Sequence, residues 1–200
     1  MLKIGILALQ GDFEAHRRRL AELGAEPVLV RKPEQLEAVD GLIIPGGESS
    51  VFLNLLGEAG FSKLADFLHN KPAFGTCAGC ILMAREVENP AQQGIGALDI
   101  TVRRNAYGRQ IDSTILEGAT TLAGGPLEQV YIRAPRIERA GPEVEVLAER
   151  DGHPVLIRQG KLMATTFHPE LSQDRRVHEE FLKLVEQHKK NNYPTQAKEA

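Results

Sequence analysis

Cysteine is scarce in this chain of 200 residues, which carries only Cys77 and Cys80. Two cysteines cannot form the disulfide framework of a small secreted protein. The chain also lacks a run of about eighteen apolar residues, so no membrane-spanning helix is expected. Its first residues have the pattern of a buried strand rather than a secretory signal. Together these absences predict a cytoplasmic location.

Neither sign of charge dominates the sequence. The 24 Lys and Arg residues against 27 Asp and Glu give a formal charge of -3, which does not favour a nucleic acid or a membrane surface as partner. With 42% hydrophobic and 26% charged residues, the composition is that of a globular protein and excludes disordered and fibrous classes. Without an internal repeat or a low-complexity linker, we expect one domain over residues 1–191 and a polar tail over residues 192–200.

Strand and helix patterns alternate in the first half of the chain. Apolar runs predict strands at residues 2–9, 27–30, 41–44 and 73–76. Helical patterns cover residues 13–23, 51–58, 62–70 and 78–86, the first with Asp12 as its N-cap. This alternation predicts an α/β fold built on a mostly parallel sheet.

The second half has more strand character and ends in a helix. Strand patterns occur at residues 98–103, 111–117, 129–132, 144–150, 154–159 and 161–167. Short turns such as Asp151-Gly152 and Gln159-Gly160 are typical of β-hairpins. The last helix is predicted over residues 174–191.

The segment at residues 75–79, Gly-Thr-Cys-Ala-Gly, lies between a predicted strand and a predicted helix. A sharp turn there would expose the Cys77 side chain, and flanking glycines remove the Cβ atoms that would collide with neighbouring backbone. A helix N-terminus favours a thiolate. The N–H group of Ala78 would be placed to bind a developing oxyanion. The segment therefore predicts a nucleophile elbow.

Three other interpretations of the cysteines stay open. Cys77 could be a buried structural residue in a glycine-rich turn. Cys77 and Cys80 also have the C-x-x-C spacing of a redox pair, although the flanking glycines are then unexplained. A zinc site is the weakest alternative, because nothing in the sequence completes four ligands.

A cysteine nucleophile needs a base, and the base needs an acceptor that orients it. The last predicted strand ends in His168-Pro169-Glu170. On an extended segment the first and third of these side chains project to the same side, with Pro169 holding the chain extended. We therefore predict that Glu170 accepts one imidazole N–H of His168 while the other nitrogen faces Cys77.

Pro45-Gly46-Gly47 follows the third predicted strand. Adjacent glycines permit positive φ and a close approach of the main chain to a ligand, so Gly47 could supply a second oxyanion donor. The alternative is an ordinary turn in which Ser49 or Ser50 caps the next helix.

The combination of these motifs resembles the class I, or triad-type, glutamine amidotransferases. Further segments are similar to the glutaminase subunits of pyridoxal 5′-phosphate synthases: Leu9-Gln10-Gly11, Pro45-Gly46-Gly47-Glu48-Ser49, Arg104-Asn105, Tyr107-Gly108-Arg109-Gln110, Ile132-Arg133-Ala134-Pro135 and Phe167-His168-Pro169-Glu170. The resemblance spans residues 1–190 and implies a single-domain, flavodoxin-like three-layer sandwich. The aliphatic residue usual in the family is replaced by Cys80, which we interpret as a small hydrophobe.

The resemblance also implies an activity: glutamine is hydrolysed to glutamate and ammonia, without a cofactor or metal. A (β/α)₈ synthase subunit in a large heteromeric complex would be the partner that uses the ammonia. Carried over by position, the triad is Cys77, His168 and Glu170, and the oxyanion donors are Gly47 and Ala78. The glutamine site comprises Gly47, Glu48, Ser49, Arg104, Ile132 and Arg133, whose arginines suit the α-carboxylate of glutamine. Gln10 and Gly11 would face the synthase.

Three rival functions remain. A glutaminase that feeds another synthase, such as that of histidine biosynthesis, is disfavoured by the segments at residues 104–105 and 132–135. A cysteine hydrolase with a related elbow would not require glutamine. A scaffolding subunit would have kept the fold without the chemistry.

Overall fold

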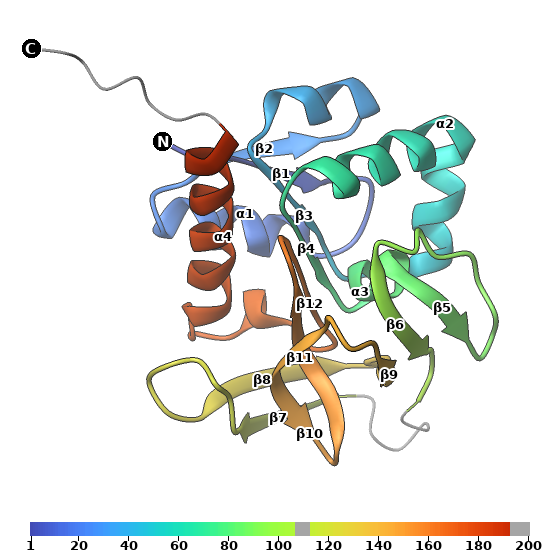
Figure 1. Cartoon of the computed structure of the whole chain (residues 1–200), viewed down its shortest axis with the longest axis vertical. Helices are drawn as coiled ribbons and strands as arrows, with labels where there is room; N and C mark the ends of the chain where they lie inside the picture. Colours follow the sequence, from blue (N-terminus) through green and yellow to red (C-terminus); the bar gives the residue numbers. More distant parts are fainter. Residues whose placement is uncertain (107–112, 193–200) are drawn as a thin grey trace, which may run out of the picture.

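The computed structural model describes residues 1–106 and 113–192 (Figure 1). The motif at residues 107–110, the start of the strand predicted at residues 111–117 and residues 193–200 of the predicted tail lie outside the described residues. None of the described helices is long and apolar enough to cross a membrane.

A seven-stranded sheet forms the centre of the fold, in the order β10-β11-β12-β4-β3-β1-β2. Five neighbouring strands are parallel: β1 (Lys3–Leu7), β2 (Glu26–Val30), β3 (Gly41–Ile44), β4 (Ala73–Thr76) and β12 (Leu162–Thr165). The antiparallel strand β11 (His153–Gln159) follows β12 at one edge and pairs with β10 (Glu145–Arg150). The predicted α/β class with added hairpins is confirmed.

Helices cover both faces of this sheet (Figure 1). On one face, Leu20 of α1 (Phe13–Glu22) and Phe181 of α4 (Arg176–Asn192) pack with Phe74 in one buried cluster. On the other, α2 (Ser49–Asn70) and α3 (Ala78–Met83) pack with β3 and β4 in a second cluster. The result is the three-layer arrangement that the resemblance implied. A short 3₁₀ turn, η1 (Pro33–Ala38), connects β2 to β3.

The helices predicted at residues 51–58 and 62–70 form one element, α2, with a kink inside it. Gly57 interrupts it with φ 60° and ψ -179°, a conformation that glycine adopts without the steric cost of a side chain. The break lies at Gly57 rather than at residues 59–61.

The helix predicted at residues 78–86 is too long, because α3 ends at Met83 and the chain continues as β5 (Ala84–Glu88). This strand pairs in parallel with β6 (Leu98–Arg103), so tertiary pairing overrides the local helical pattern. Strand β9 (Arg136–Ala140), which the sequence analysis missed because it is short and charged, completes this second sheet. Strands β7 (Ser113–Gly118) and β8 (Leu127–Ile132) form a separate hairpin.

Gly79 allows α3 to pack directly against β3. A Cβ atom at this position would collide with the carbonyl oxygen of Ile44, which is main chain and cannot rotate away. We therefore expect Gly79→Ala to lower the free energy of unfolding by about 2 kcal/mol or more, measured by chemical denaturation. Gly60→Ala is the matched control, because a Cβ atom there makes only ordinary contacts, 3.4 Å from Leu56 Cδ2. Equal stability of both variants would contradict this account of Gly79.

Candidate active site

The carboxyl ends of the parallel strands meet at one edge of the sheet, where α/β folds place their ligand sites. Here β1, β3, β4 and β12 are followed by the segments that contain Gln10, Gly47, Cys77 and His168. These segments enclose a pocket of about 350 Å³. It is lined by Gln10, Asp12, Gly47, Glu48, Ser49, Cys77, Ile81, Arg104, Asn105, Ile132, Arg133, Pro135 and His168. Nine predicted site residues therefore line one pocket, although they are distant in the sequence.

Cys77 lies in a sharp turn between β4 and α3. Its φ of 47° and ψ of -100° are strained for a residue with a side chain, and its N–H donates to the Thr165 carbonyl at 2.9 Å. The turn leaves no space for side chains at the flanking glycines: a Cβ atom on Gly75 would lie 2.7 Å from the carbonyl carbon of Gly79. These observations give the predicted elbow its geometry, with the buried Ala78 directly after Cys77.

His168 and Glu170 are brought together, but not by an extended segment. Residues Pro169–Leu171 form a 3₁₀ turn, η2, so the predicted extended conformation is wrong. Proline is compatible with the first turn of a helix, which explains why Pro169 does not keep the chain extended. The turn places Nδ1 of His168 at 2.8 Å from Oε1 of Glu170, with both side chains buried.

The charged form of His168 is favoured in this position. Burial lowers the pKa of His168, but hydrogen bonds with Cys77 and Glu170 and the negative charges of both partners outweigh it and raise the pKa to about 10. Burial also raises the pKa of Glu170, and the hydrogen bond with His168 opposes that shift. The imidazole therefore links a thiol and a carboxylate, an arrangement that can activate a nucleophile and then protonate a leaving group.

Asp12 is a pocket residue that the sequence analysis treated only as a helix cap. It precedes α1, yet its side chain makes no capping hydrogen bond. Its Oδ2 lies 3.6 Å from Nδ1 of His168. In the sequence, the indication that Asp12 belongs to the site was its position directly after the Gln10-Gly11 motif.

Asp12, His168 and Glu170 also bring potential metal ligands within 4.8 Å of one another. A metal bound at Nδ1 of His168 would have to replace the proton that this nitrogen shares with Glu170 across 2.8 Å. We therefore interpret this cluster as a hydrogen-bonded acid–base group. The expectation of no metal stays a prediction.

The Gln10 side chain lies against the Gly47 turn. Its amide donates to the Glu48 carbonyl at 3.1 Å and accepts from the Glu48 N–H at 3.2 Å. Gly11, at φ 83°, packs so closely that a Cβ atom there would collide with the carbonyl oxygen of Gly46. The segment predicted to face a synthase thus contacts the predicted oxyanion loop within this chain.

The pocket lining includes the acidic residue Glu48 and the basic residues Arg104 and Arg133. The Arg104 guanidinium donates to Glu48 Oε1 at 2.8 Å. The backbone of Arg133 adopts a positive φ of 43°, which is uncommon for a residue with a side chain. Glu48, rather than Ser49 or Ser50, occupies the N-cap position of α2. The Ser49 hydroxyl donates to Gln92 at 2.8 Å. The pocket therefore carries both a carboxylate and guanidinium groups, which suits a zwitterionic ligand.

Cys80 lies in α3 and is not among the residues that line the pocket. Both cysteines are free, and Cys80 is completely buried in the apolar cluster of that face of the sheet. Burial raises the pKa of the Cys80 thiol, which favours the uncharged form. Its environment is that of a small hydrophobe.

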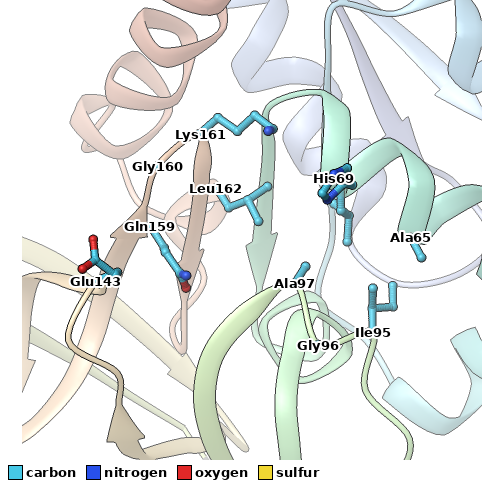
Figure 2. Close-up of a pocket in the computed structure, with 11 residues that line it drawn as sticks. Ala65, His69, Ile95, Gly96, Ala97, Glu143, Gln159, Gly160, Lys161 and Leu162 are labelled. Atoms are coloured by element: carbon cyan, nitrogen blue, oxygen red, sulfur yellow. The ribbon is translucent and has the colours of Figure 1, made fainter.

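A second hollow, of about 590 Å³, opens near the amino end of β12 (Figure 2). Its lining consists of Ala65, Leu68, His69, Ile95, Gly96, Ala97, Glu143, Gln159, Gly160, Lys161 and Leu162. This set includes no cysteine, and His69 and Glu143 lie on opposite sides of the hollow (Figure 2). The candidate active site is therefore the pocket that contains Cys77.

Comparison with known proteins identifies the family. The family model of the SNO glutamine amidotransferases matches residues 6–187, nearly the whole chain. The chain belongs to the SNO glutamine amidotransferase family. The identity predicted from the elbow and the His-Pro-Glu segment is thereby confirmed.

Individual relatives of this glutamine amidotransferase support the same identity. The chain is similar to a pyridoxal 5′-phosphate synthase subunit PdxT from Koribacter versatilis, 68% identical over 92% of this chain and 96% of the relative. A PdxT subunit from Fervidobacterium nodosum is 48% identical over 94% of this chain and 99% of its own. A crystal structure of a glutamine amidotransferase superimposes with a TM-score of 0.86, at 43% identity over 92% of this chain and 98% of that one.

Proposed function

We propose that this chain hydrolyses L-glutamine to L-glutamate and ammonia through a thioester on Cys77. The observation that carries the proposal is the Cys77–His168–Glu170 constellation, with Cys77 on a strained elbow and His168 between the two partners. It lies in a pocket with the opposite charges that the α-amino and α-carboxylate groups of glutamine require.

In this mechanism the Cys77 thiol gives its proton to His168, and the resulting thiolate attacks the side-chain amide carbon of glutamine. The C–S bond forms, and the N–H groups of Gly47 and Ala78 hold the negative oxygen. His168 then protonates the departing nitrogen as the C–N bond breaks, and ammonia leaves. His168 next accepts a proton from water, whose oxygen attacks the thioester carbon. The C–S bond breaks, glutamate leaves, and His168 returns the proton to the Cys77 sulfur. Glu170 holds the imidazole in the required tautomer throughout.

We further propose that the ammonia passes to a (β/α)₈ synthase subunit of pyridoxal 5′-phosphate synthase, in a large heteromeric complex. The names of the two relatives support this assignment. Gln10 and Gly11 are proposed to face that subunit. Their contacts with Gly46 and Glu48 would let a partner that moves them reach the oxyanion loop. The cytoplasmic location, the boundary between a domain at residues 1–191 and a tail, and the lack of nucleic-acid, membrane and cofactor partners stay predictions.

Glutamate release tests the proposal. The purified chain is assayed with glutamine alone and with its cognate synthase subunit, and we expect release that increases with the partner. No release in either condition, with a reduced Cys77 and demonstrated binding of the subunit, would favour the hydrolase or the scaffold function.

Within the glutamine site, the Glu48–Arg104 pair is proposed to bind the charged end of the substrate. We expect Arg104→Met to raise KM for glutamine about 10–100-fold with a smaller change in kcat, since a charge-assisted hydrogen bond contributes about 1.5–3 kcal/mol. Arg103→Met is the control, because Arg103 pairs outside the pocket with Glu138 at 2.9 Å. The assignment would be wrong if both variants kept the original KM.

A further inference from the structure

Two histidines lie beneath the proposed triad, and the mechanism above does not use them. His16 belongs to α1 and His178 to α4, which lie on the same face of the sheet (Figure 1). Both side chains are completely buried. Their rings pack against Phe74, with centroid distances of 6.4 Å for His16 and 5.8 Å for His178.

The His16 ring lies close to the strand end before Cys77 and to the carboxylate of Glu170. Its Nε2 lies 3.2 Å from the hydroxyl of Thr76, the residue directly before Cys77. The same nitrogen lies 3.5 Å from Oε2 of Glu170, a longer contact than the hydrogen bond with Thr76 and one that does not itself form a hydrogen bond in this structure. Oε2 is the carboxylate oxygen that does not face His168, and among the described residues it is buried without a hydrogen-bond partner. A donor directed at this oxygen would fix the plane of the carboxylate.

The contact between the two histidines determines which nitrogen of His16 carries the proton. Nδ1 of His16 lies 3.0 Å from Nε2 of His178. Nδ1 of His178 is buried and has no partner within the described part of the chain. Because a buried N–H without an acceptor is rarer than an unpaired acceptor, we assign the proton of His178 to Nε2. His178 then donates to Nδ1 of His16, and the His16 proton is on Nε2, which faces Thr76 and Glu170.

The charged groups around the pair keep both rings neutral. Burial lowers the pKa of His16 well below its ordinary value, with the charges of His178 and His168 adding to the effect. Burial and the nearby Arg19 lower the pKa of His178 to about 3. Asp12 and Glu170 are the carboxylates beside His168. The histidine pair therefore stays a fixed donor while His168 changes its protonation.

We propose that His16 is a positioning residue of the glutaminase reaction: it is held by His178, and it directs its Nε2 proton toward Thr76 and the free carboxylate oxygen of Glu170. This inference rests on the proposed function, because it acts through the Cys77–His168–Glu170 constellation. Glu170 would then face N–H groups at both oxygens, through the hydrogen bond with His168 and the longer contact with His16. Through Thr76, the same ring also contacts the strand that carries the elbow.

Three substitutions separate the donor from the bulk of the ring. His16→Met keeps an apolar side chain of similar length without a donor. His16→Gln restores an N–H at the position of Nε2, and His16→Asn places its amide only at the position of Nδ1. His69→Met, an exposed helix residue at the second hollow, is the matched control (Figure 2).

The test measures kcat and KM for glutamine against pH, in the complex with the cognate synthase subunit. We expect His16→Met to lower kcat about 10–100-fold with little change in KM. Loss of a residue that orients a metal ligand by a hydrogen bond has an effect of this size on activity. Without the donor, the Glu170 carboxylate is easier to protonate, so the acid limb of the kcat profile should move to higher pH. His16→Gln should recover most of kcat and the original acid limb, and His69→Met should match the original protein throughout.

Several outcomes would overturn the proposal. A folded His16→Met protein with the original kcat and pH profile would show that the donor is not needed. A His16→Gln protein as impaired as His16→Met would show that the ring acts only by packing. If His16→Met does not fold, the proposal is tested by comparing kcat of His16→Gln with kcat of His16→Asn. Only His16→Gln places an N–H at the position of Nε2, so equal kcat values would contradict a role for that N–H. Absence of Cys77-dependent release in the original protein is a different failure, that of the proposed function.

Discussion

Cys77→Ala is expected to abolish glutamate release, with a loss of kcat on the order of 10⁴-fold or more. The reason is that alanine cannot form the γ-glutamyl thioester, and neither His168 nor Glu170 is a nucleophile toward an amide in this geometry. The fold should persist, because alanine differs from Cys77 only by the missing sulfur atom and places the same Cβ atom in the turn at φ 47°. The measurement is glutamate release in the presence of the synthase subunit.

Two controls accompany this prediction. Cys80→Ala, which removes the other buried thiol, should keep most of the activity, because Cys80 is in the apolar cluster and not in the pocket lining. Mass spectrometry of the original protein, quenched during turnover, should show a glutamyl adduct on Cys77. Turnover that persists in Cys77→Ala would exclude the covalent route.

Glu170→Gln is expected to have the second largest effect, a decrease in kcat of roughly 10²–10⁴-fold. Glutamine has nearly the same shape, but it carries no charge to stabilise the imidazolium of His168. Since Glu170 helps to raise the pKa of His168, its loss should also shift the alkaline limb of the kcat/KM profile to lower pH. A variant with an unchanged profile would contradict the role of Glu170.

The same substitution should change how stability depends on pH. The pKa of His168 is raised from 6.5 to about 10 in the folded protein, so its protonation stabilises the fold fully below pH 6.5. That contribution is lost as the pH rises through 10. Between these two pH values, the difference in the free energy of unfolding between the original protein and Glu170→Gln should therefore decrease. Denaturant unfolding at several pH values measures it, and a constant difference would contradict the linkage.

Local patterns in the sequence predicted most elements of the central sheet. The strand at Gly41–Ile44 has the predicted boundaries because it is a fully buried apolar run that ends at Pro45. The strand Leu98–Arg103 is also as predicted. The errors lie where long-range pairing decides the conformation. Residues 84–86 were predicted to be helical, but they belong to β5 because β6 offers a partner strand.

At the site, local patterns were enough to identify the groups that are present: a cysteine between two glycines, a late histidine with a nearby carboxylate, and a Pro-Gly-Gly turn. Chemical identity and the glycine pattern of a turn are local properties, so these could be found without the fold. The tertiary structure decided what each group contacts. It turned Asp12 toward His168 and joined Glu48 to Arg104 from distant segments, whereas the predicted His168–Glu170 pair formed across a 3₁₀ turn instead of an extended segment. It also placed His16 and His178 together, because α1 and α4 pack on the same face of the sheet, and no local pattern records which two helices will be neighbours.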